Sequence, residues 1–194
     1  MESKKILVIL GHPYKDSLGG KLAESYTKGA KKAGHDIKEV DLGELSFDPI
    51  LHKGYKERQE LEPDLVRVQE DIKWADHLVF VYPIWWGSFP ALLKGFVDRT
   101  FLPGFGFKYH KDSPLWDRLL KGKSARLIMT MDGPKIFDSL VLCRAGIKIM
   151  KRSILNFCGV SPVRVTRIDK VRVRDDKNIN KILQKVEKLG RQGK

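Results

Sequence analysis

The chain has 194 residues, 42% hydrophobic and 31% charged, a balance typical of a globular protein with one sizeable core. Its formal net charge is +13, but the basic residues alternate with apolar ones and no nucleic-acid-reading motif is present, so we predict no nucleic-acid partner. The apolar run at residues 6–10 is too short for a signal peptide or a membrane span, and two cysteines without CxxC spacing predict reduced thiols, which together indicate a cytoplasmic protein.

Short apolar runs alternate with amphipathic segments along the chain. The apolar runs predict buried strands at residues 4–10, 35–42, 77–83, 125–131 and 163–168. The amphipathic segments predict helices from Asp16 or Ser17 to residue 33, after Pro63, at 90–101, at 139–157 and after Asp175 or Asp176, with a short helix at 115–120. Residues 43–62 are expected to form a loop, and the segments 170–174 and 190–194 to be mobile.

This alternation predicts a doubly wound α/β fold in one domain over residues 1–194. Five strands in this length fit a flavodoxin-like parallel sheet of order 2-1-3-4-5. In such a sheet the loops after the first, third and fourth strands meet, and these are residues 11–18, 83–89 and 130–135. The topology therefore predicts a ligand site among these three loops.

Several other chemistries lack their motifs. No GxGxxG follows the first strand, and the Gly122-Lys123-Ser124 triplet precedes a strand and has Asp117 where a P-loop needs glycine. The five histidines are scattered without ligand spacing, so we predict no metal site. No GxSxG nucleophile elbow is present.

The loop G-H-P-Y-K-D-S-L precedes a predicted helix N-terminus, which favours a phosphate. His12 and Ser17 can donate to it, and Lys15 adds charge, although Ser17 can also serve only as a helix cap and His12 as an ordinary loop residue. Trp85 and Trp86 suit a planar heterocycle, or they can be core or interface aromatics. Together the two loops favour a flavin mononucleotide (FMN).

Three segments carry a resemblance to a known family. They are G-H-P-x(4)-S, the stretch Y-P-I-W-W-G-S-F-P-A-L-L-K-G-F-V-D-R-T-F, and P-G-F-G-F-K-Y. They resemble the flavodoxin-fold NAD(P)H:quinone oxidoreductases, the group that includes DT-diaphorase and the ancillary flavoprotein of bacterial potassium-efflux systems. The resemblance runs from the first strand to Pro162, and its most specific part is P-x-x-W-x-x-x-P-A-x-L-K-G.

The resemblance implies a role for each matching position. It implies that the flavin phosphate and ribityl chain are held by His12, Ser17, Leu18 and Gly19. It implies that the isoalloxazine is lined by Pro83, Ile84, Trp85, Trp86 and Gly87 on one side and by Thr130, Met131, Asp132 and Gly133 on the other. It also implies that Phe107 and Tyr109 cover the substrate across a homodimer interface.

The chain departs from the family at two places. The Tyr and His of DT-diaphorase-like members are replaced by Phe137, at the substrate position, and by Cys143, which is a poor proton carrier at neutral pH. The usual T-T-G-G reads T-M-D-G, and this places the Asp132 carboxylate where it disfavours an anionic reduced flavin unless it points away. The long second-strand loop and C-terminal extension of adenine-binding members are absent, so FMN is favoured over FAD.

The sequence thus predicts an FMN-dependent NAD(P)H oxidoreductase, homodimeric, that reduces quinones or similar aromatic acceptors by two electrons in a ping-pong cycle. The alternative is a flavin-binding redox-sensing regulatory module with little turnover, such as the partner of a membrane transporter. Residues 163–194 favour that alternative, since they hold 11 Lys plus Arg against 4 Asp plus Glu and could dock on an acidic partner.

Overall fold

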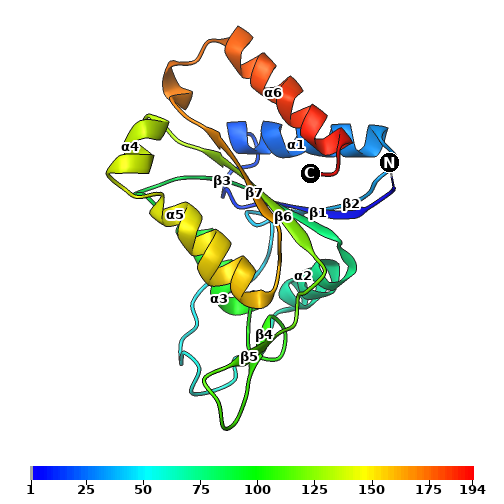
Figure 1. Cartoon of the computed structure of the whole chain (residues 1–194), viewed down its shortest axis with the longest axis vertical. Helices are drawn as coiled ribbons and strands as arrows, with labels where there is room; N and C mark the ends of the chain where they lie inside the picture. The colour runs from blue at the N-terminus through cyan, green and yellow to red at the C-terminus, as the bar shows by residue number, and fades with distance from the viewer. Residues whose placement is uncertain (1) are drawn as a thin grey trace.

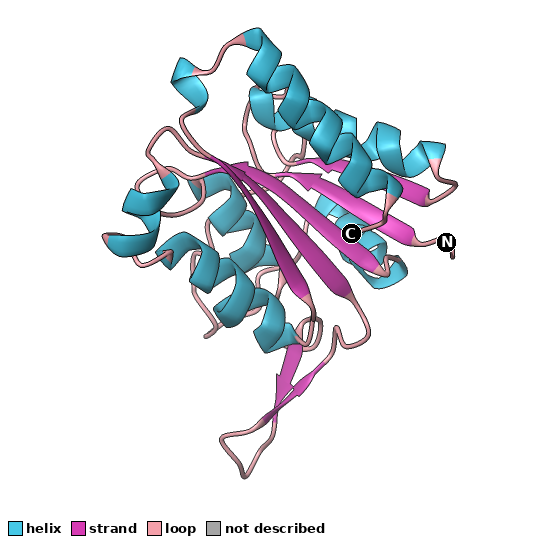
Figure 2. Cartoon of the chain, turned by 45° about the horizontal axis from the view of Figure 1, so that its top comes forward, coloured by secondary structure: helices cyan, strands magenta, loops and turns pink. Residues whose placement is uncertain are grey.

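The computed structural model describes residues 2–194, which are built around a five-stranded parallel sheet (Figures 1 and 2). The strands are β1 (Lys5–Leu10), β2 (Asp36–Asp41), β3 (His77–Pro83), β6 (Ser124–Thr130) and β7 (Val163–Ile168). Their order, β2-β1-β3-β6-β7, confirms the predicted 2-1-3-4-5 arrangement because β4 and β5 form a separate hairpin. All seven residues of β3 are buried, as expected of a central strand covered on both faces.

Helices cover both faces of the sheet. One face carries α1 (Leu18–Lys32) and α6 (Asp176–Arg191), which lie side by side (Figure 1). The other carries α2 (Pro63–Trp74), α3 (Ala91–Thr100) and α5 (Ala145–Lys148), the last continued by a wider π-type helix, η1 (Ile149–Asn156). Within residues 2–194, none of the helices combines the length and the apolar character needed to cross a membrane.

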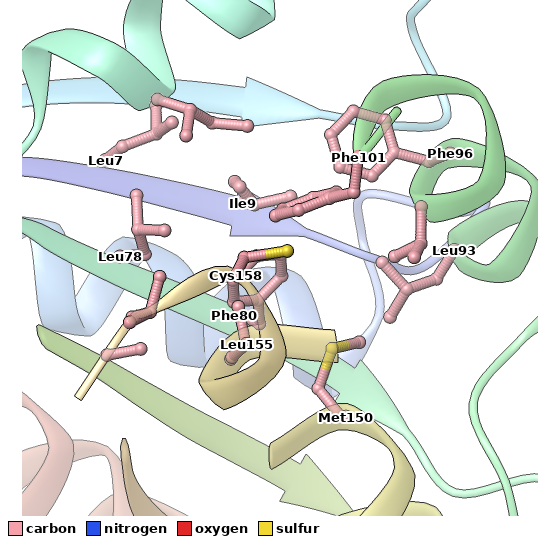
Figure 3. Packing of buried hydrophobic residues seen from close by; sticks show 14 of the residues in the cluster. Leu7, Ile9, Leu78, Phe80, Leu93, Phe96, Phe101, Met150, Leu155 and Cys158 are labelled. Carbon is pink, nitrogen blue, oxygen red and sulfur yellow. The ribbon is translucent and has the colours of Figure 1, made fainter. Parts of the chain in front are cut away.

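The core follows from the alternation of side chains along the strands. In β1, Leu7 and Ile9 point to one face while their neighbours point to α1 and α6. Figure 3 shows Leu7 and Ile9 in one hydrophobic cluster with Leu93 of α3 and Met150 of η1. Because helices pack against both faces of the sheet, the carboxyl ends of β1, β3 and β6 are held in fixed positions.

The predicted continuous helix at residues 139–157 is wrong. It is divided into α4 (Lys135–Leu140) and the α5–η1 helix, with Cys143 and Arg144 in the left-handed region at φ 50° and 57°. The break brings Gly146 against the loop after β3, where its N–H donates to the carbonyl of Gly87 at 3.0 Å. A side chain at Gly146 would lie 2.8 Å from that oxygen, so this contact overrides the helical pattern of the sequence.

The predicted helix at residues 115–120 is also wrong. Those residues form β5 (Trp116–Arg118), which pairs antiparallel with β4 (Phe107–Tyr109) in a hairpin that projects from the sheet (Figure 2). Trp116 stacks on Phe157 at 4.4 Å and donates from its indole N–H to the Phe157 carbonyl at 2.9 Å. Contact with Phe157, at the end of η1, therefore explains why these residues form a strand rather than a helix.

The remaining boundaries agree closely with expectation. Residues 43–62 form a loop, α2 begins at Pro63, and Asp175 caps α6 through a hydrogen bond from the Asn178 N–H at 2.7 Å. The end of the chain is packed rather than free, because the hydroxyl of Tyr26 in α1 donates to the Lys194 carbonyl at 3.3 Å.

Candidate functional site

A cavity of about 420 Å³ opens at the carboxyl ends of β1, β3 and β6, where the topology predicts a ligand site. Twelve of the thirteen residues predicted to bind a cofactor line it: His12, Ser17, Leu18, Gly19, Pro83, Ile84, Trp85, Gly87, Thr130, Met131, Asp132 and Gly133. Backbone hydrogen bonds fix the loops to one another, from the Ile84 N–H to the Thr130 carbonyl at 2.7 Å and from the Val171 N–H to the Met131 carbonyl at 3.3 Å.

The first wall of the cavity is the N-terminus of α1. Ser17 caps this helix, since its hydroxyl oxygen accepts from the Gly20 N–H at 3.2 Å. The N–H groups of Leu18 and Gly19 make no hydrogen bond to residues 2–194. Two unpaired donors and the positive end of the helix dipole therefore face the cavity.

His12 adds a donor of defined orientation. Its Nδ1 accepts from the Tyr14 N–H at 2.9 Å, so in the neutral ring Nε2 carries the proton. Burial lowers the pKa of His12 from its usual value of 6.5, which keeps the ring neutral at pH 7. Its ring lies 5.5 Å from that of Trp85 in an edge-on arrangement. Lys15, by contrast, faces away and pairs with Glu44 at 2.7 Å.

The second wall is a tight turn after β3. Trp85 and Ser88 exchange two backbone hydrogen bonds of 2.8 and 2.9 Å, and the central residues Trp86 and Gly87 have φ of 51° and 74°. Positive φ at both central positions defines a type I′ turn, in which a tryptophan is strained and a glycine is not. The turn directs the Trp86 side chain fully into solvent, so Trp86 is the one predicted cofactor residue that does not line the cavity.

The third wall follows β6 and is acidic rather than basic. Asp132 is exposed, its Oδ1 accepts from the Arg172 N–H at 3.2 Å, and within residues 2–194 its carboxylate forms no ion pair. Lys135 pairs with Asp169 at 3.4 Å, and Arg144 Nε donates to the Ser139 hydroxyl, so neither side chain neutralises Asp132. Among the described residues that line the cavity there is no Lys or Arg. An anion in the cavity must therefore be held by uncharged donors, which include backbone N–H groups and the side chains of Ser17 and His12.

The three predicted substrate residues are in different places. Phe137 of α4 lines the cavity and is 49% exposed. Phe107 is buried in the core, 4.9 Å from the ring of Phe157, and Tyr109 is 58% exposed on the hairpin. Neither Phe107 nor Tyr109 lines the cavity of its own chain.

The structure adds four lining residues that were not singled out from the sequence: Pro134, within the predicted loop 130–135, and Asp138, Leu142 and Val171 outside the predicted loops. Asp138 is buried and pairs with Arg167 of β7 at 3.0 Å. Val171 follows β7, whose carboxyl end lies at the same edge of the sheet, so the topology rule applied to one more strand would have found it. Asp138 and Leu142 could not be found this way because the helix there was predicted with the wrong boundaries.

Comparison with known proteins gives a consistent result. The chain is 30% identical to an uncharacterized NAD(P)H oxidoreductase of Haemophilus influenzae, over 88% of this chain and 86% of that one. It is 28% identical to NAD(P)H dehydrogenase (quinone) 1 of Cavia porcellus, over 80% of this chain and 65% of that one. The crystal structure of Smu.1420 from Streptococcus mutans UA159 superposes with a TM-score of 0.81 at 30% identity, over 96% of this chain and 98% of that chain.

Three of the curated relatives are longer proteins, of which the chain spans 58%, 65% and 66%. Residues 4–190 match the family described as having a flavodoxin-like fold. That match covers the whole sheet and nearly all of both helix layers, and it agrees with the resemblance carried by the His12, Trp85 and Phe107 segments. The chain therefore belongs to the family of proteins with a flavodoxin-like fold.

Proposed function

We propose that the chain is an FMN-dependent NAD(P)H oxidoreductase that reduces quinones or similar aromatic acceptors by two electrons. The names of its relatives in Haemophilus influenzae and Cavia porcellus support the use of NAD(P)H and, for the second, of a quinone. The observation that carries the proposal is the cavity itself, which has unpaired N–H donors at one end and aromatic and apolar walls beyond them.

The residues present fit FMN. The unpaired N–H groups of Leu18 and Gly19, with the Ser17 hydroxyl and His12 Nε2, suit a phosphate that must be held without Lys or Arg. A volume of about 420 Å³ lies in the range of small-ligand pockets. Bound FMN would supply the hydride chemistry, which protein side chains cannot perform alone.

The remaining lining residues take the roles that the resemblance implies. Ile84, Trp85 and Gly87 on one side and Met131 and Gly133 on the other bound the space for the isoalloxazine. The N–H groups of Asp132 and Gly133, which make no hydrogen bond within residues 2–194, can donate to its polar edge. Phe137 then stands where a planar donor or acceptor would stack. We propose that NADH or NADPH and the acceptor occupy that space in turn.

We further propose that the chain is a homodimer. Large apolar side chains are exposed beside the cavity at Trp86, Ile136, Leu140 and Val141, of which Leu140 is 73% exposed. Such a cluster on one face is typical of an interaction surface. A second subunit there could bring its Tyr109 to the cavity, which the hairpin of the same chain does not reach. Reduced thiols at Cys143 and Cys158 support a cytoplasmic location, and two hydrophobic clusters on one sheet support a single domain.

The test is an absorption spectrum of the purified protein, reconstituted with FMN if colourless, before and after anaerobic addition of NADPH or NADH without quinone. We expect flavin bands that bleach within seconds and return when a quinone such as menadione is added. Parallel lines in double-reciprocal plots of initial velocity, measured at several fixed quinone concentrations, would then identify the ping-pong cycle. Flavin bands that neither nucleotide bleaches would favour the redox-sensing module, and a protein that binds no flavin would refute the proposal.

A further inference from the structure

A second hollow, of about 700 Å³, lies along the open edge of β7, beside the α5–η1 helix that runs next to that strand (Figure 1). Among the described residues that line it, seven are Lys or Arg and none is Asp or Glu. We call it the basic groove. Besides Arg126 its cations are Arg144, Lys148, Lys151, Arg152, Arg164 and Arg167.

Most of these charges are uncompensated. Arg167 pairs with Asp138 at 3.0 Å, but the side chains of Lys148, Lys151, Arg152 and Arg164 form no hydrogen bond or ion pair within residues 2–194. Burial, aided by the nearby charge of Arg164, lowers the pKa of Arg126. Cations gathered in one hollow raise its potential and attract an anionic ligand.

The backbone beside the groove is also unpaired. β7 is the edge of the sheet and pairs with β6 alone in the part of the chain that the structure describes. The carbonyls of Pro162 and Ile168 accept from β6, so every second residue points its backbone groups inward. Val163, Val165 and Arg167 therefore point theirs outward, and no hydrogen bond found outside the sheet ladders uses them. This edge can accept another strand.

A simpler explanation covers part of this arrangement. Charged residues on an edge strand prevent edge-to-edge aggregation, and Arg164 and Arg167 meet that need. That explanation does not account for Lys148, Lys151 and Arg152, which come from the neighbouring helix and line the same groove. Cations of both β7 and the neighbouring helix surround the unpaired edge of β7, and this arrangement indicates a binding site.

We propose that the basic groove binds an extended acidic segment of a protein partner, which adds to the sheet as a strand beside β7. The outward-facing backbone N–H and C=O groups of Val163, Val165 and Arg167 would form hydrogen bonds with this segment. Acidic side chains at alternate positions of the segment would pair with Lys148 and Arg152. The length of β7, six residues, sets the segment at about six residues or 20 Å. A second copy of this chain would bring like charges, and a free phosphate would leave the ladder unused.

The test uses the full-length protein and a fluorescein-labelled eight-residue peptide of alternating glutamate and threonine, followed by fluorescence anisotropy. Lys148→Gln/Arg152→Gln removes two exposed groove charges, and we expect it to weaken binding about tenfold. Lys181→Gln/Lys185→Gln on α6 makes the same change in net charge outside the groove, and we expect it to change binding less than about twofold. Equal losses in both variants would overturn the proposal.

Two further probes distinguish binding of the peptide as a β-strand from binding of any polyanion by charge alone. Peptides N-methylated on the glutamates or on the threonines lack alternate N–H donors, and only one of these sets can face β7. We expect one methylated peptide to bind at least about tenfold more weakly than the other. If both bind like the unmodified peptide, or if a 15-nucleotide oligothymidylate binds where the peptide does not, the groove is not an acidic-strand site.

Discussion

Ser17 both caps α1 and lines the cavity, so its replacement tests the proposed phosphate site. Its oxygen accepts the Gly20 N–H at 3.2 Å, which leaves the hydroxyl hydrogen free to donate into the cavity. Ser17→Ala removes both bonds. Loss of the cap should lower the free energy of unfolding by about 1 kcal/mol. Loss of a hydrogen bond to a charged group, about 1.5–3 kcal/mol, should raise the Kd for FMN about 10- to 100-fold.

Two further variants separate capping from phosphate binding. Ser17→Asp keeps a good helix cap but places a carboxylate beside the phosphate, and at about 4 Å with an effective dielectric near 20 the repulsion is about 4 kcal/mol per charge pair. We expect stability close to that of the unmodified protein and FMN binding weaker by at least about 100-fold. Asp175→Ala removes the equivalent cap of α6, so it should cost about 1 kcal/mol of stability without changing FMN affinity.

The assays are urea unfolding of the flavin-free protein and titration of flavin fluorescence with FMN and with riboflavin. Riboflavin lacks the phosphate, so the Ser17 variants should bind it nearly as well as the unmodified protein does. The reasoning is refuted if Ser17→Asp binds FMN with unchanged Kd, or if Ser17→Ala weakens FMN and riboflavin by the same factor.

Three other predictions concern stability and assembly. Arg99 is fully buried and pairs with Glu62 at 2.9 Å, so Arg99→Met should destabilise by about 3 kcal/mol in urea unfolding, and adding Glu62→Leu should recover part of that loss. Burial lowers the pKa of His77 to about 3, below the 6.5 of an exposed ring. Above pH 6.5 the ring is neutral in both the folded and the unfolded chain, so His77 does not reduce the free energy of unfolding there. Stability should fall below pH 6.5 by up to about 1.4 kcal/mol per pH unit, and His77→Gln should flatten that slope, whereas identical slopes would contradict the assignment. Trp86→Ser should shift the protein from dimer to monomer in light scattering while flavin affinity is retained, and a dimer of unchanged Kd would exclude this surface.

The sequence by itself determined the sheet and most of the cavity. The five strands were found because continuous apolar runs such as residues 77–83 have few alternatives to a buried strand. Asp16 or Ser17, and Asp175 or Asp176, marked two helix starts as capping residues, and the structure shows that Ser17 and Asp175 form the caps. Once the strand order is known, the loops after β1, β3 and β6 must converge, and this is why twelve predicted residues line one cavity.

Tertiary structure decided what depends on contacts between distant segments. Trp116 forms a strand because it stacks on Phe157, and the helix near Arg144 breaks where Gly146 meets the loop after β3. The outward direction of Trp86 follows from a turn whose φ values no periodicity reveals. The basic groove likewise exists because β7 and η1 lie together, so that cations of both elements line one hollow along the edge of the sheet. Charge spacing along the chain indicated an excess of basic residues, and only folding placed those residues around one open strand.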